Sequence, residues 1–126
     1  MEHQPTHVII LVVEDDLRVC ELLHDVLTEE GYEVITAPTG EAALLTIATV
    51  RPNLITLDLD LPGISGETVL KELRQRDDAR ELPIVIVSAK HPIPAEVRKL
   101  AQAVVAKPFG LDELITTIRN LIAPPP

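Results

Sequence analysis

The stretch NLITLDLDLPG, residues 53–63, decides the fold. Its apolar and β-branched residues, from Leu54 to Asp58, indicate a strand that is buried on both faces. Such strands are typical of parallel sheets covered by helices on each side. The run ends on two aspartates, Asp58 and Asp60, and a carboxylate at the end of an apolar strand is costly to desolvate unless another group pairs with it. The stretch therefore predicts a parallel sheet with a polar site at its edge.

The rest of the chain repeats this strand-then-helix pattern. Further strands are predicted at 8–13, 33–37, 82–87 and 103–106. The first predicted helix carries apolar residues from Val19 to Leu27 and ends at Gly31, and the other predicted helices are 41–50, 66–76, 95–101 and 111–122. Five βα units with right-handed crossovers predict an α/β fold, a doubly wound sandwich.

The length of 126 residues suits one domain with a sizeable core. We expect a flexible N-terminus at 1–6, the folded domain at 7–122, and a proline-rich tail or linker remnant at 123–126. The N-terminus lacks the apolar core of a signal peptide, and no apolar run approaches membrane-spanning length. These features predict a cytoplasmic protein that does not enter the membrane.

The charge and cysteine content narrow the class of protein. There are 20 acidic residues against 11 basic ones, a net charge of −9, which argues against direct nucleic-acid binding. The one cysteine, Cys20, excludes an internal disulfide and a cysteine zinc site, and it lies in a helical pattern that favours a packed thiol. The negative net charge is compatible with cation binding and with basic protein partners.

Polar residues follow four of the predicted strands. They are Glu14, Asp15, Asp58, Ser88 and Lys107. Because ligands bind at the carboxyl ends of strands in such sheets, all five can converge on one edge. Taken singly, a serine here would be a turn residue and the lysine a solvated side chain, just as Asp16 is most simply a helix N-cap. Their joint placement favours a functional site.

The chemistry of this set indicates a cation and an anion. Converging carboxylates repel one another, and a bound cation removes the conflict. An all-oxygen set with few protein ligands is what Mg²⁺ takes. Ser88 and Lys107 then need an anion, and a phosphoryl group accounts for all five residues, with one carboxylate as the nucleophile.

Four motifs carry a family resemblance. ILVVEDD, LITLDLDLPGISG, PIVIVSAK and VVAKPF resemble the receiver domain of two-component response regulators, in that family's order and over residues 7–122. The resemblance implies a flavodoxin-like fold with strand order 2-1-3-4-5. It also implies that a histidine kinase or a histidine phosphotransfer protein donates a phosphoryl group to an aspartate, in a signalling step rather than an enzymatic turnover.

The resemblance assigns roles residue by residue. Asp58 matches the phosphoacceptor, and Glu14 and Asp15 match the acidic pair that binds Mg²⁺ together with Asp58 and the backbone carbonyl of Asp60. Ser88 matches the switch hydroxyl. Lys107 matches the lysine that pairs with the acceptor and then with the phosphoryl group, and Pro108 would follow a cis peptide bond.

The sequence departs from the family in two places. The family often has an aromatic residue three before the lysine, which swings inward when the hydroxyl moves, but Val104 stands here. The stretch between Ser88 and Lys107 is shorter than usual and contains Pro92 and Pro94, which predicts a short or irregular fourth helix. Signal transmission is therefore expected to rest mainly on Ser88 and its loop.

Two other functions remain open from the sequence. The pattern of an apolar strand followed by DxD is also the first motif of haloacid-dehalogenase-like phosphatases, in which the second aspartate is a general acid–base. That family's closing acidic pair follows its lysine at a strand end, whereas Asp112 and Glu113 lie inside the last predicted helix. The third possibility is a receiver-like interaction module that is never phosphorylated, although no site residue is missing.

Asp60 has two interpretations of equal weight. It contributes only its backbone carbonyl, or its side chain guards the mouth of the site, where it could pair with Lys90 as an exposed and weak ion pair. The sequence contains no output domain, so the chain either acts by docking to a downstream protein or belongs to a longer chain with a fused output domain.

Overall fold

The computed structural model describes residues 7–122, so the expectations for residues 1–6 and 123–126 lie outside the described part. The strands are β1 (Ile9–Val13), β2 (Glu33–Ala37), β3 (Leu54–Leu57), β4 (Ile84–Ser88) and β5 (Ala103–Ala106). The helices are α1 (Leu17–Glu29), α2 (Gly40–Thr49), α3 (Gly66–Arg74), α4 (Ala95–Arg98) and α5 (Leu111–Ile122). None of these helices has the length and apolarity needed to span a bilayer.

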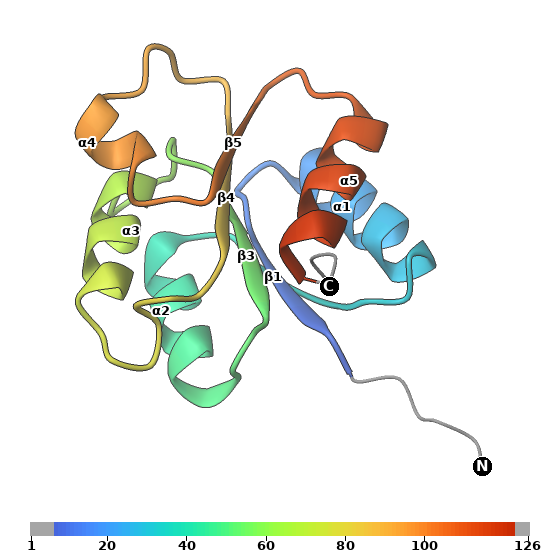
Figure 1. The fold of residues 1–126 in the computed structure, drawn as a ribbon, viewed down its shortest axis with the longest axis horizontal. Helices are drawn as coiled ribbons and strands as arrows, with labels where there is room; N and C mark the ends of the chain where they lie inside the picture. The colour runs from blue at the N-terminus through green and yellow to red at the C-terminus, as the bar shows by residue number, and fades with distance from the viewer. Residues whose placement is uncertain (1–6, 123–126) are drawn as a thin grey trace.

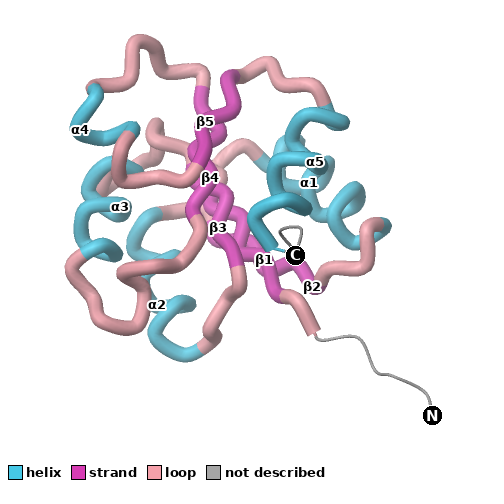
Figure 2. The backbone as a smooth tube through the Cα atoms, viewed as in Figure 1, coloured by secondary structure: helices cyan, strands magenta, loops and turns pink. Residues whose placement is uncertain are grey.

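The five strands form one parallel sheet in the order β2-β1-β3-β4-β5, which confirms the predicted fold. Helices α1 and α5 cover one face, and α2, α3 and α4 cover the other (Figures 1 and 2). The register pairs Val13 of β1 with Leu57 of β3. The residues that follow these two strands, Glu14 and Asp58, therefore emerge side by side at the same edge.

Alternation along the central strands divides the core into two clusters. Leu11 and Val13 face the cluster under α2, α3 and α4, whereas Ile10 and Val12 face the cluster under α1 and α5. All four side chains are at most 1% exposed. Burial on both faces explains why these strands are continuous apolar runs in the sequence.

Side chains at the helix starts explain where the helices begin. The Asp16 carboxylate accepts the backbone N–H of Arg18, which confirms the predicted N-cap of α1. Thr39 and Ser65 cap α2 and α3 in the same way. Gly31 follows α1 with a φ of 99°, a conformation that glycine adopts without strain.

Helices α3 and α4 are shorter than predicted. Both continue beyond their last α-helical residue as tight i→i−3 turns, for example from the N–H of Leu100 to the carbonyl of Val97. The apolar spacing therefore extends past the α-helical hydrogen bonding. Helix α4 has only four residues, as expected for a segment that begins after Pro94.

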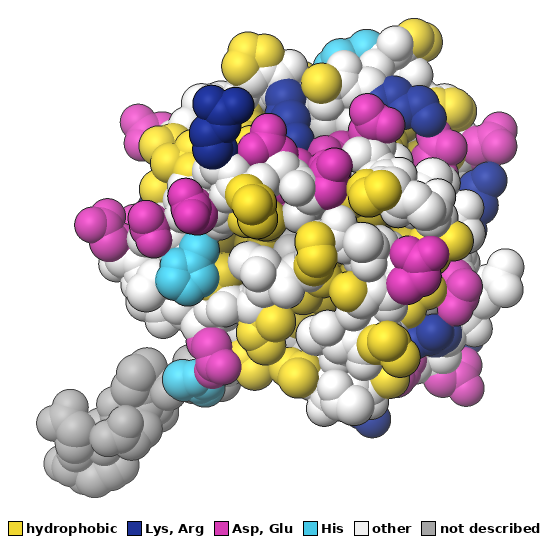
Figure 3. All heavy atoms as spheres, turned by 180° about the vertical axis from the view of Figure 1, so that it is seen from behind, with side chains coloured by type: hydrophobic (Ala, Val, Ile, Leu, Met, Phe, Trp, Pro, Cys, Tyr) yellow, Lys and Arg dark blue, Asp and Glu magenta, His cyan; other side chains and the backbone are white. Residues whose placement is uncertain are grey.

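Acidic side chains are spread around the face seen from behind, and hydrophobic side chains gather across its centre (Figure 3). Two leucines, Leu17 of α1 and Leu45 of α2, are about three-quarters exposed. Single exposed apolar side chains are common on protein surfaces. These two leucines lie outside the two buried clusters that form the core.

Candidate functional site

Asp58 lies at the carboxyl end of β3, in the middle of the sheet. Its backbone N–H donates to the Val13 carbonyl at 3.1 Å, and the residue is only 5% exposed. The carboxylate oxygen Oδ1 accepts the backbone N–H of Asp60 at 3.0 Å, and Oδ2 accepts a hydrogen bond from Lys107. Each oxygen of the buried carboxylate that the sequence indicated thus has a donor.

Glu14 and Asp15 follow β1. The N–H of Glu14 donates to the Ala37 carbonyl at 3.0 Å, and its side chain accepts the N–H of Asp16 at 3.2 Å. Glu14 is only 2% exposed. Asp15 is exposed. The pair therefore combines one buried and one solvent-facing carboxylate.

Lys107 joins the two buried carboxylates. Its Nζ lies 2.7 Å from Oε1 of Glu14 and 3.0 Å from Oδ2 of Asp58. Its backbone N–H donates to the Ser88 carbonyl, and the following peptide bond to Pro108 is cis, as the resemblance implied. One ammonium group thus bridges the ends of β1 and β3 from the end of β5.

Burial and neighbouring charges shift two pKa values here. Burial raises the pKa of Glu14 above its ordinary 4.5, and Asp58 adds to this, against the hydrogen bonds from Lys107 and the Asp16 N–H. Burial lowers the pKa of Lys107, but its hydrogen bonds and attraction to Glu14 and Asp58 outweigh this and raise it above 10.5. Lys107 is therefore an ammonium at neutral pH, and the site still carries excess negative charge.

The carboxylates form a cluster that suits a divalent cation. Glu14, Asp15 and Asp58 each offer one oxygen, and these atoms lie within 4.8 Å of one another. Three carboxylates against one ammonium leave negative charge uncompensated. Oxygen-only donors of this kind fit Mg²⁺. The cluster is the set of acidic residues that the sequence predicted.

Ser88 ends β4, between the strands that precede Asp58 and Lys107. The residue is fully buried, and its Oγ accepts the backbone N–H of Lys90 at 3.1 Å. All five residues of the predicted constellation therefore follow or end strands at one edge of the sheet.

Lys90 does not pair with Asp60, so the ion pair considered in the second interpretation of Asp60 is wrong. Lys90 Nζ lies 3.0 Å from Oε2 of Glu67, in the first turn of α3. The physical reason is that α3 begins against the end of β3, where the N–H of Gly66 donates to the Leu59 carbonyl at 3.0 Å, and this brings Glu67 within reach of the loop after β4. Asp60 is exposed, and its backbone N–H binds Asp58.

Glu67 and the Glu14–Lys107 bond were missed by the sequence analysis. Glu67 is 23 residues from Lys90, and Glu14 is 93 residues from Lys107. Glu67 lies in the first turn of α3, after the N-cap Ser65. The helix dipole already explains a carboxylate in a first turn, so the sequence gives no reason to expect a further partner. No local pattern singles out either partner.

Val104 is half-buried in β5 and packs against the core under α2, α3 and α4. The chain's one phenylalanine, Phe109, packs against the other core. The position that is often aromatic in the family is thus filled by a small side chain.

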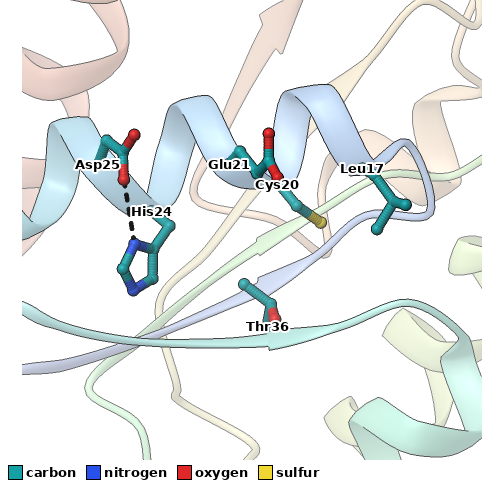
Figure 4. A pocket seen from close by; sticks show the side chains of 6 residues that line it. All are labelled: Leu17, Cys20, Glu21, His24, Asp25 and Thr36. Atoms are coloured by element: carbon teal, nitrogen blue, oxygen red, sulfur yellow. Dashed lines mark hydrogen bonds and ion pairs between the residues drawn. The ribbon is translucent and has the colours of Figure 1, made fainter.

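A hollow lies elsewhere, between α1 and β2, with a volume of about 390 Å³ (Figure 4). Its walls are Leu17, Cys20, Glu21, His24, Asp25 and Thr36. The Cys20 thiol donates to the Glu14 carbonyl at 3.1 Å, and burial raises its pKa, with help from nearby acidic residues. This confirms the predicted packed thiol and makes it a poor nucleophile.

Comparisons with known proteins identify the class. The family model of the response regulator receiver domain matches residues 10–119. The transcriptional regulatory protein KdpE of Mycobacterium tuberculosis is 39% identical over 117 residues, which cover 90% of this chain and 50% of that protein. The phosphate regulon transcriptional regulatory protein PhoB of Rhizobium meliloti is 36% identical, again over 90% of this chain and 51% of the relative.

A solved structure of the response regulator TrrA from Thermotoga maritima, in complex with Mg²⁺-BeF, superposes with a TM-score of 0.84 at 36% identity. It covers 90% of this chain and 98% of that chain. The same regulator in complex with the histidine kinase ThkA gives a TM-score of 0.83 at 35% identity, over 92% and 99% of the two chains.

The chain belongs to the response regulator receiver domain family, whose members are signalling proteins of two-component systems. This finding favours the receiver over the phosphatase alternative. The chain spans about half the length of the curated relatives it matches.

Proposed function

We propose that Asp58 is the phosphoacceptor of this receiver and takes a phosphoryl group from a histidine kinase or a histidine phosphotransfer protein. The observation that carries the proposal is the position of its carboxylate. It is buried at the end of the central strand, bonded to the Lys107 ammonium and adjacent to two further carboxylates. A nucleophile beside a fixed cation suits attack on an anionic phosphoryl donor.

The transfer step exchanges one bond for another. A carboxylate oxygen of Asp58 bonds to phosphorus while the phosphorus–nitrogen bond of the donor phosphohistidine breaks, and the electron pair returns to the imidazole. Lys107 already binds Oδ2, and its ammonium would offset the negative charge of the incoming phosphoryl oxygens. Ser88 donates its hydroxyl to a phosphoryl oxygen, since it lies at the same edge of the sheet. The chain thus assists its own phosphorylation and is not a turnover enzyme.

Glu14, Asp15 and Asp58 would hold Mg²⁺, with the backbone carbonyl of Asp60 as a further ligand. When bound, Mg²⁺ supplies positive charge to the transferring phosphoryl group. The cluster of three carboxylates, with a raised Glu14 pKa, supports this assignment. Because the acidic set exceeds the one ammonium in charge, Lys107 alone does not neutralise it.

The partners follow from the family and the charge. TrrA, a similar structure, is in complex with a histidine kinase, and the similar KdpE and PhoB are transcriptional regulators of about twice this length. We therefore propose a cytoplasmic receiver that acts on a downstream protein or a fused output domain. A net charge of −9 does not favour direct contact with nucleic acid.

Intact-mass spectrometry with a small phosphodonor tests the function. Incubation with acetyl phosphate and Mg²⁺ should add one labile phosphoryl group, and a chelator should prevent the addition. Asp15→Asn should weaken Mg²⁺ binding and slow the addition, whereas Asp25→Asn, in the second half of α1 and outside the carboxylate cluster, should not. A chain that gains no phosphoryl group under these conditions would be the unphosphorylated interaction module instead.

A further inference from the structure

An ion pair links the loop after β4 to the start of α3. Lys90 Nζ lies 3.0 Å from Oε2 of Glu67, and the two side chains are 45% and 23% exposed. Lys90 is two residues beyond Ser88, and Glu67 is in the first turn of α3. The pair therefore connects the segment that carries the Ser88 hydroxyl with the segment that follows Asp58.

The Glu67 side of this pair is held rigidly. The N–H of Gly66 donates to the Leu59 carbonyl at 3.0 Å, and a Cβ on Gly66 would lie only 2.2 Å from the Asp58 carbonyl oxygen. The start of α3 is thus packed directly on the backbone at the end of β3. A carboxylate in the first turn is also favoured by the helix dipole.

The Lys90 side is attached to the switch hydroxyl. The backbone N–H of Lys90 donates to Ser88 Oγ at 3.1 Å, the one hydrogen bond of that hydroxyl oxygen within residues 7–122. The loop then passes Pro92 and Pro94 to the four-residue helix α4, so little regular structure supports it. Lys90 therefore holds Ser88 with its backbone and reaches Glu67 with its side chain.

We propose that Lys90 and Glu67 are positioning residues whose ion pair restrains the Ser88 hydroxyl in the unphosphorylated protein. This inference rests on the proposed function of Asp58 and Ser88. The Lys90 N–H holds the hydroxyl oxygen where it is, so any movement of the hydroxyl toward a phosphoryl group on Asp58 pulls on this bond and on the loop. The ion pair opposes this movement, so removing either partner favours the phosphoryl-bound state.

The expected effect is modest because the pair is partly exposed. Ion pairs of this kind typically change an equilibrium by about two- to fivefold. The sign is more informative than the size. If the two residues acted only through their charges, the Glu67 carboxylate would weaken anion binding and the Lys90 ammonium would strengthen it. Neutralising Glu67 would then raise the affinity for an anion, and neutralising Lys90 would lower it. As a restraint, the pair predicts the same direction for both.

The experiment measures the apparent affinity for beryllofluoride in the presence of Mg²⁺, followed by NMR on the full chain. Glu67→Gln and Lys90→Gln should each raise the affinity about two- to fivefold. The double variant should gain no more than the better single variant, and the swap Glu67→Lys with Lys90→Glu should return to the wild-type value. Glu72→Gln, which opens the pair between this residue of α3 and Arg76 just beyond the helix, is the matched control and should have no effect.

Two results would overturn the proposal while leaving the proposed function intact. One is weaker binding by Lys90→Gln, which would make Lys90 a ligand of the anion. The other is a double variant whose gain equals the product of the single gains, which would mean that the two residues act independently. A wild-type chain that binds no beryllofluoride would overturn the proposed function and this inference with it.

Discussion

The two halves of the functional edge are built differently. At the ends of β1 and β3, Glu14 and Asp58 are at most 5% exposed and are held by backbone hydrogen bonds to neighbouring strands. After β4, the loop contains two prolines, leads to a helix of four residues and is tied by a half-exposed ion pair. The comparison teaches that the carboxylates are fixed by the fold, whereas the Ser88 loop depends on a few side-chain contacts.

Side-chain contacts outside this loop are made by Arg74, at the end of α3. Its guanidinium donates to the carbonyls of Leu100, Ala79 and Arg80, and to the Gln102 side chain. Leu100 lies between α4 and β5. Arg74 therefore anchors the connection that follows the short α4, where regular secondary structure is lacking.

The largest expected effect is on the rigid half. Gly66→Ala would place a Cβ 2.2 Å from the Asp58 carbonyl oxygen and 2.6 Å from the Leu59 Cα, and backbone atoms cannot move aside cheaply. We expect a loss of about 3 kcal/mol in the free energy of unfolding, measured by urea denaturation. Gly110→Ala is the control, because its Cβ would meet nothing within 4 Å. Equal stability of the two variants would refute the tight contact.

The second effect is on the connection after α4, which Arg74 anchors. Arg74→Met should remove one hydrogen-bond donor from each of three carbonyls. We expect a loss of about 2 kcal/mol in the free energy of unfolding, with NMR shifts concentrated around Leu100. Arg76→Met, which removes only the exposed pair with Glu72, should cost almost nothing. If both variants lost the same stability, Arg74 would not be the anchor of this connection.

The third effect is a pH dependence of the rigid half in the absence of metal. The pKa of Glu14 is raised above 4.5 by burial, so between pH 4.5 and its folded pKa the folded chain binds more protons than the unfolded chain. Stability from this group therefore falls as pH rises through that window, by at most about 1.4 kcal/mol per pH unit. Glu14→Gln should remove this decline.

Thermal or urea unfolding across that pH range, with a chelator present, measures the decline. Glu113→Gln, on α5 and outside the carboxylate cluster, serves as the matched acidic control and should keep the wild-type profile. A Glu14→Gln profile parallel to that of the wild type would contradict the raised pKa.

The smallest effect sharpens the role of Asp60. Its exposed carboxylate repels an incoming phosphodonor anion, so Asp60→Asn should speed phosphorylation about twofold at low salt and less at high salt. Mass or radiolabel must be followed, since the chain has no tryptophan. If Asp60→Asn left the low-salt phosphorylation rate unchanged, the Asp60 side chain would have no role, and only its backbone carbonyl would contribute.

The sequence predicted the fold well because both faces of the sheet are buried. Leu11, Leu57 and Ile86 belong to continuous apolar runs, and such runs specify parallel strands whatever the surface residues are. Asp58, Glu14 and Lys107 could be predicted because each follows a strand directly. Their position is then set by the sheet itself.

What could not be predicted depends on side chains that meet across loops. Lys90 and Asp60 carry opposite charges near the same opening, and the sequence offers their pairing as one of two interpretations. The structure pairs Lys90 with Glu67 because the start of α3 packs against the backbone after β3, a contact that needs the small Gly66. Glycine packing of this kind leaves no charge pattern in the sequence.

The most direct test of the central claim is to locate the phosphoryl group. After incubation with acetyl phosphate and Mg²⁺, borohydride reduces an aspartyl phosphate to homoserine, which peptide mass spectrometry assigns to a position. The account predicts homoserine at position 58 only, and no adduct in Asp58→Asn. Homoserine at Asp15 or Asp60, or a labile phosphoryl adduct that persists in Asp58→Asn, would contradict it.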